Sequence, residues 1–137
     1  MNQITPNYPL IAHAADSLSA ANGKPLAEIT LDEAAVGRLS AADLQISAET
    51  LRAQAEIARR AGYEQLAANL RRAAELTAVP NAGLLAMYDT LRPGRATLTE
   101  LLALADTLER EYQAAENARF VREAASVYQA RGLLRRE

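Results

Sequence analysis

The sequence contains no cysteine, no tryptophan, one phenylalanine and one histidine in 137 residues. The absence of cysteine excludes disulfides, thiolate zinc sites and cysteine nucleophiles, and it makes the cytoplasm the expected compartment. No stretch approaches the roughly 20 apolar residues that a membrane-spanning helix needs, so we expect no membrane partner. The first residues also lack the basic and apolar regions of a signal peptide.

The charge is nearly balanced. The formal net charge is -2, and paired arginines such as Arg59 and Arg60 stand close to acids such as Glu56 and Glu64. A nucleic-acid-binding surface would need an excess of positive charge, so we expect no nucleic-acid partner. The mixed charges favour a solvated helix face.

Half of the residues are hydrophobic, but aromatic residues make up only 4% of the chain and much of the apolar share is alanine. Alanine contributes little buried area per residue. The composition therefore predicts one small domain with a thin core, which would complete its burial against a partner.

Residues 1–46 are predicted to form a mostly extended arm with short helices. Proline recurs in the stretches NYPL (7–10) and GKPL (23–26), where it favours extended backbone in the preceding residue. A short helix is expected after Thr30, with Glu33 completing a capping box and Gly37 ending it. A single turn is expected from Ser40.

Residues 47–137 are predicted to form a small, irregular helical bundle, so the fold class is all-α. Ser47 begins a helix that ends before Gly62, and the breaks at Pro80 and Pro93 separate the next two. Thr97 and Glu100 form a second capping box ahead of an amphipathic helix. The last helix, expected from Asn117 to about Arg131, is apolar on more than one side.

A catalytic site is not expected on this chain. His13 has no ligand-like neighbour at helical spacing, and paired acids such as Glu109 and Glu111 do not face each other on a helix. The RPGR turn (92–95) is too short for a phosphate-binding loop, and Pro93 removes one backbone donor. We therefore expect no catalytic residue, no bound cofactor and no metal ligand here.

The residues that we predict at a subunit interface come from the arm, the RPGR turn and the outer face of the last helix. Arginine suits bidentate pairing across an interface, although pairing within the chain explains the same arginines equally well. The predicted interface residues are Tyr8, Pro9, Leu10, Arg92, Arg95, Phe120, Val121, Arg122 and Tyr128.

Several stretches resemble the small subunit of adenosylcobalamin-dependent glycerol and diol dehydratases. They are RRAAELTAVP (71–80), LRP (91–93) followed by Arg95, ELLALADTLE (100–109) and FVREAASVY (120–128). In the arm, NYPL (7–10) and GKPLAEITL (23–31) agree as well. The chain departs from the family pattern at Gly94, where an aromatic residue is common, and at Ala96, where serine is.

The resemblance implies a non-catalytic helical subunit in a heterohexamer with two copies each of a large, a medium and a small subunit. In that family the other subunits hold adenosylcobalamin, an activating metal ion and the substrate, and the complex converts glycerol or a 1,2-diol to an aldehyde and water by a radical route. The long targeting extension of some relatives is not expected in this chain, and enclosure in a bacterial microcompartment stays open. The alternative is a free-standing helical adaptor or oligomerisation module.

Overall fold

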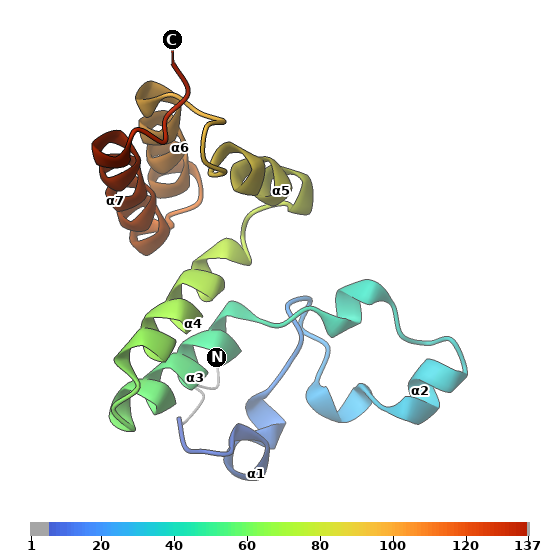
Figure 1. The fold of residues 1–137 in the computed structure, drawn as a ribbon. Helices are drawn as coiled ribbons and strands as arrows, with labels where there is room; N and C mark the ends of the chain where they lie inside the picture. The colour runs from blue at the N-terminus through green and yellow to red at the C-terminus, as the bar shows by residue number, and fades with distance from the viewer. Residues whose placement is uncertain (1–5, 137) are drawn as a thin grey trace. The chain divides into compact units, whose positions relative to one another are not determined.

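The computed structural model describes residues 6–136, and every named element in that range is a helix (Figure 1). The ends of the two predicted ranges, residues 1–5 and 137, lie outside the described residues. The predicted all-α class is confirmed. The α-helices are α1 (Leu10–His13), α2 (Leu31–Ala35), α3 (Ala48–Arg60), α4 (Glu64–Leu76), α5 (Asn81–Thr90), α6 (Leu98–Glu111) and α7 (Ala115–Arg131).

The chain divides by its contacts into two compact units, one ending at Thr77 and the other beginning at Ala78. The first unit joins the arm to α3 and α4, and the second contains α5, α6 and α7. The contacts thus group the arm with the first helix pair. Its predicted role as a partner-binding element stays a prediction.

The arm is built from short helical turns joined by extended segments. Three 3-10 helices (Ala15–Ser17, Leu26–Glu28 and Ala41–Leu44) alternate with α1 and α2. Isolated antiparallel bridges join Ser19 to Pro25 and Ala20 to Ile46, and the second bridge ties the arm to the residue before the cap of α3. The arm therefore folds back on itself before α3 begins.

The short helix α2 begins where the sequence predicts, but only half of its capping box forms. The Thr30 side chain accepts a hydrogen bond from the Glu33 amide at 3.2 Å. The Glu33 carboxylate pairs instead with Arg38, at 3.1 Å. A nearby arginine thus competes with the backbone for the carboxylate, and this competition is not visible in the capping pattern alone.

Helices α3 and α4 pack side by side through small side chains. Ser47 caps α3 by accepting from the Thr50 amide, and Gly62 makes the turn to α4 with a φ of 85°, which glycine adopts without strain. Most of the buried residues of the two helices are alanines, among them Ala55, Ala58 and Ala67. Alanine allows close approach of the helices but buries little area per residue.

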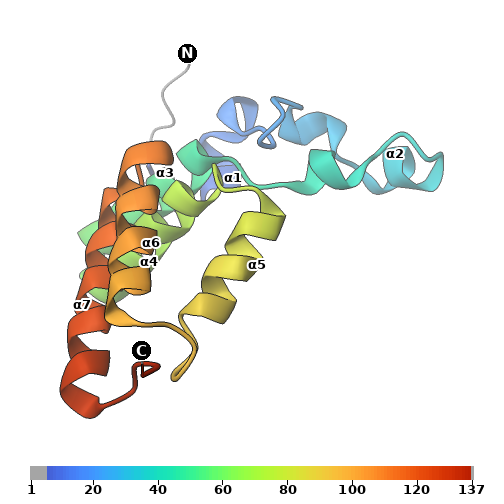
Figure 2. The same ribbon diagram turned by 90° about the horizontal axis from the view of Figure 1, so that it is seen from above.

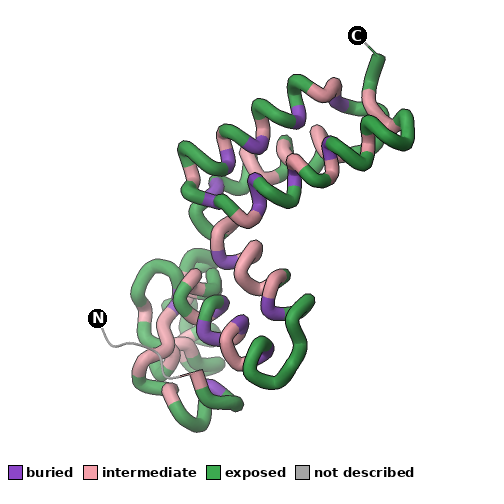
Figure 3. Tube along the Cα trace, turned by 90° about the vertical axis from the view of Figure 1, so that its left-hand side faces the viewer, coloured by how far each residue is buried: buried purple, intermediate pink, exposed green. Residues whose placement is uncertain are grey.

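In the second unit, α6 packs against α7. Figure 2 shows the two helices side by side. Thr97 and Glu100 form the predicted capping box, with both reciprocal hydrogen bonds present. Buried positions recur between exposed ones along the longer helices (Figure 3). Helix α7 begins at Ala115, two residues before the predicted start, and ends at Gly132 in the left-handed conformation, with a φ of 65°.

One cluster of the second unit's core lies at one end of the α6–α7 pair. Leu101 is the one large side chain in the described residues that is fully buried, and it clusters with Ala96 and Ala125. Partly buried apolar side chains pack around this cluster: Leu91, Leu98, Tyr128 and Leu134. One fully buried large residue surrounded by small ones is a thin core.

Candidate functional site

Two of the arm residues predicted at an interface, Tyr8 and Leu10, line an apolar groove in the first unit. Tyr8 and Pro9 are exposed, whereas Leu10 is buried, and the Tyr8–Pro9 peptide bond is cis. The groove has a volume of about 610 Å³ and contains no charged residue in its lining, which consists of Tyr8, Leu10, Gln54, Ile57, Ala58, Ala61, Tyr63, Leu66 and Leu70. Tyr8 and Leu10 thus belong to one groove.

The groove follows from the spacing of apolar residues on α3 and α4. Ile57 and Ala61 are four residues apart on one wall, and Leu66 and Leu70 repeat that spacing on the other. Tyr63 lies in the turn between the helices and is exposed. The four-residue spacing is visible in the sequence, but the groove depends on the packing of α3 against α4.

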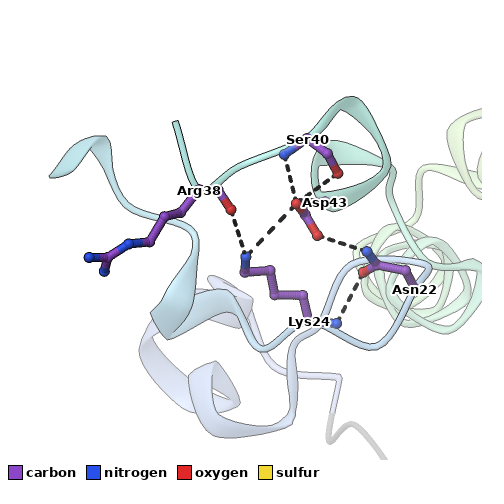
Figure 4. Close-up of polar contacts among 5 residues, drawn as sticks. All are labelled: Asn22, Lys24, Arg38, Ser40 and Asp43. Atoms are coloured by element: carbon purple, nitrogen blue, oxygen red, sulfur yellow. Dashed lines mark hydrogen bonds and ion pairs between the residues drawn. The ribbon is translucent and has the colours of Figure 1, made fainter. Parts of the chain in front are cut away.

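A polar network holds the arm together around Asp43, as Figure 4 shows. The Asp43 carboxylate accepts hydrogen bonds from the Ser40 backbone amide at 2.7 Å, the Ser40 hydroxyl at 2.8 Å and the Asn22 side-chain amide at 2.8 Å. Lys24 lies 3.8 Å from the same carboxylate and donates to the Arg38 carbonyl at 3.4 Å. The hydrogen bond from the Ser40 backbone is the main cause that lowers the Asp43 pKa to about 2.

The network at Asp43 crosses between segments 21 residues apart, so local patterns could not predict it. Only the turn from Ser40 is predictable from the sequence. The donors around Asp43 already use its oxygens, and this favours a structural role over a catalytic one.

The RPGR turn is fixed by the segment that follows α7. The Gly94 amide donates to the Leu133 carbonyl at 2.8 Å, and the Arg135 amide donates to the Ala96 carbonyl at 2.8 Å. Arg92 and Arg95 are exposed on this turn. The Arg92 guanidinium lies 3.6 Å from the Asp89 carboxylate. Both side chains are exposed, so this ion pair contributes little to the stability of the fold.

The predicted interface residues of α7 lie in three different environments. Phe120 is exposed, whereas Val121 is buried within its own unit. Arg122 pairs with Asp106 at 2.8 Å and Glu109 at 2.6 Å, and hydrogen bonds to these acids raise its pKa. That guanidinium therefore already holds α6 to α7.

Tyr128 is half-buried, and its hydroxyl donates to the Leu91 carbonyl at 2.7 Å. The ring packs against the Leu101 cluster. Its position joins α7 to the end of α5, a contact between residues 37 apart in the sequence.

The described part of the chain offers no constellation for metal binding. In residues 6–136, no group of three or more His, Cys, Asp or Glu side chains is placed to hold a metal ion. His13 is exposed at the end of α1. The same range contains no helix that is both long and apolar enough to cross a membrane.

A family described as dehydratase small subunit matches residues 4–135. The chain is similar to the propanediol dehydratase small subunit of Citrobacter freundii, with 47% identity over 129 residues that cover 94% of this chain and 75% of that protein. The identity and coverage are the same for the propanediol dehydratase small subunit of Salmonella typhimurium.

Proposed function

The chain belongs to the family of dehydratase small subunits, and from that premise we propose that it is the non-catalytic small subunit of a diol dehydratase complex. The observation that carries this proposal is the colinear match over 94% of the chain to propanediol dehydratase small subunits. A match of that length concerns the whole fold and does not depend on one motif.

The reaction of the complex removes water from glycerol or a 1,2-diol and gives an aldehyde. Adenosylcobalamin would supply the radical chemistry when bound, and an activating metal ion would bind the substrate, both in the other subunits. The described residues of this chain do not fit a metal ion, because they contain no suitable cluster of ligands. The part that this chain plays is accordingly assembly.

The partners are a large and a medium dehydratase subunit, with two copies of each of the three chains in the complex. Support comes from the exposed apolar residues in both units, among them Tyr8, Leu66, Leu85 and Phe120. Surfaces of this kind on a small chain are typical of protein interfaces. The location that we propose is the cytoplasm, and enclosure in a bacterial microcompartment would depend on a signal from another subunit.

Within the predicted interface set, exposure separates two roles. Tyr8, Pro9 and Phe120 are exposed and would contact a partner directly. Leu10 and Val121 are buried and would support those surfaces from beneath. Arg122 would keep its pairs on α6, and Tyr128 would hold the end of α5 in place.

Co-expression with the large and medium subunits tests the proposal. With an affinity tag on the large subunit only, we expect this chain to co-purify and to elute with the complex in size-exclusion chromatography. If the chain elutes alone or self-associated and is never retained by the tagged subunit, the free-standing adaptor replaces the proposal.

A further inference from the structure

Helix α5 is held at its ends rather than along its length. In the described part of the chain, the long helices that pack side by side are α3 with α4 and α6 with α7, and α5 belongs to neither pair. None of the ten residues of α5 is buried. A helix of this length is marginal in water without tertiary packing, so α5 depends on the contacts that fix its ends.

The sequence of α5 gives it little stability of its own. No side chain caps its first turn, because Pro80 stands at the N-cap position. Gly83 lies within the helix, where glycine is less favourable than alanine. Val79, shortly before the helix, is buried and fixes the chain on that side. The contacts at the other end therefore decide whether α5 stays in place.

The C-terminal end of α5 is joined to α7. Leu91, which follows the last helical residue, packs against the cluster around Leu101. The Leu91 carbonyl accepts a hydrogen bond from the Tyr128 hydroxyl at 2.7 Å. This hydroxyl is one of two features of the second unit that hold the end of α5.

The other feature is the segment that follows α7, residues 133–135, which we call the C-terminal strap. Its backbone pairs with the RPGR turn. The Gly94 amide donates to the Leu133 carbonyl at 2.8 Å, and the Arg135 amide donates to the Ala96 carbonyl at 2.8 Å. Leu134, between these two strap residues, packs against the same cluster as Leu91. The strap thus fixes the turn that leads out of α5.

The Arg135 side chain adds two contacts on the far side of the turn. It donates to the Arg95 carbonyl at 3.2 Å and to one carboxylate oxygen of Glu100 at 2.6 Å. The other oxygen of Glu100 accepts from the Thr97 amide at 2.8 Å and completes the capping box of α6. Loss of the Arg135 side chain would therefore free the turn and leave the cap of α6 in place.

We propose that α5 and the RPGR turn open as a unit separate from the α6–α7 pair, and that the C-terminal strap and the Tyr128 hydroxyl keep this unit closed. Segments with few buried apolar contacts open at a lower free energy than a packed core. The inference concerns the fold of this chain alone and does not depend on the proposed function.

Hydrogen exchange of the full-length chain, measured amide by amide with nuclear magnetic resonance, tests the separate opening. We expect the hydrogen-bonded amides of α5, such as Leu91, which donates to the Met87 carbonyl at 3.0 Å, to be protected at least about tenfold less than those in the middle of α6 and α7. Equal protection in α5 and α6 would overturn the proposal, because α5 would then open only with the whole unit.

Two substitutions test the contacts that keep the unit closed. Tyr128→Phe removes the hydroxyl and keeps the ring, and we expect exchange in α5 to become about fivefold faster. Arg135→Ala removes two exposed side-chain contacts, and we expect an acceleration of about threefold. Arg136→Ala is the matched control, because Arg136 is the exposed neighbour beyond the strap, and it should leave exchange in α5 unchanged.

A third substitution, Arg135→Pro, also removes the backbone donor to Ala96 and should accelerate exchange in α5 more than Arg135→Ala does. In every variant, exchange in the middle of α6 and α7 should stay as in the wild-type chain. Unchanged exchange in α5, or an equal effect of Arg136→Ala, would show that the strap does not keep α5 closed. Equal acceleration in α5, α6 and α7 would show that these contacts stabilise the whole unit, and it would overturn the proposal as well.

Discussion

Replacing Leu101 with alanine removes the largest fully buried side chain of the described residues. Leu101 is 0% exposed and lies at the centre of the cluster that joins α6 and α7. The substitution removes three carbon atoms, which at about 0.8 kcal/mol each corresponds to roughly 2.4 kcal/mol of transfer free energy. The cavity that remains adds to this value, so we expect a loss of about 3 kcal/mol in the free energy of unfolding.

The measurement is urea unfolding of the full chain followed by far-ultraviolet circular dichroism. With a denaturant slope of about 1.5 kcal/mol per molar urea, the midpoint of the affected transition should fall by about 2 M. Leu102→Ala is the matched control, because the neighbouring leucine is 42% exposed, and we expect it to cost less than about 1 kcal/mol. An equal effect of the two substitutions, or no effect of Leu101→Ala, would refute the placement of the core.

Three other perturbations have expected outcomes. Thr97→Ala removes one half of the capping box of α6 and should lower the free energy of unfolding by about 1 kcal/mol in the same assay. Thr97→Ser keeps a hydroxyl and should retain most of that stability. An equal loss of stability in both variants would argue against the cap. The pKa of Asp43 is about 2, below its usual value of 3.8, so its stabilisation of the arm is complete above pH 3.8 and is lost as the pH falls through 2. Protection of the Ser40 amide against hydrogen exchange, relative to its intrinsic rate at each pH, should fall over that window, and this fall should be absent in Asp43→Asn; identical profiles would contradict the role of Asp43. Phe120→Asp should weaken retention by the large subunit and keep the helical signal of the chain, because Phe120 is exposed; loss of that signal would place Phe120 in the internal core.

Helix boundaries were predictable wherever a cap or a breaker acts locally. Ser47, Gly62 and Thr97 start or end helices where the sequence predicts, because their contacts lie within four residues. The exception is the start of α7, which begins without a side-chain cap, so no polar signal marks it. The capping box of α2 forms only in part because Arg38 pairs with the Glu33 carboxylate.

The surfaces were harder to predict because they depend on pairs of segments. Leu10 and Val121 were grouped with exposed neighbours such as Phe120, but their burial depends on which side of the helix or arm faces the unit. The ion pairs of Arg122 join α6 to α7 across 13 and 16 residues. The sequence alone does not decide whether Arg122 pairs within the chain or with a partner subunit.

The most direct test of the central claim is dehydratase activity reconstituted with and without this chain. Large and medium subunits are purified together, supplied with adenosylcobalamin and a 1,2-diol, and assayed for the aldehyde. We predict that the complete three-chain complex forms the aldehyde, that the two larger subunits alone are much less active or fail to assemble, and that this chain alone is inactive. Full activity of the two larger subunits without this chain, with no association when it is added, would contradict the account.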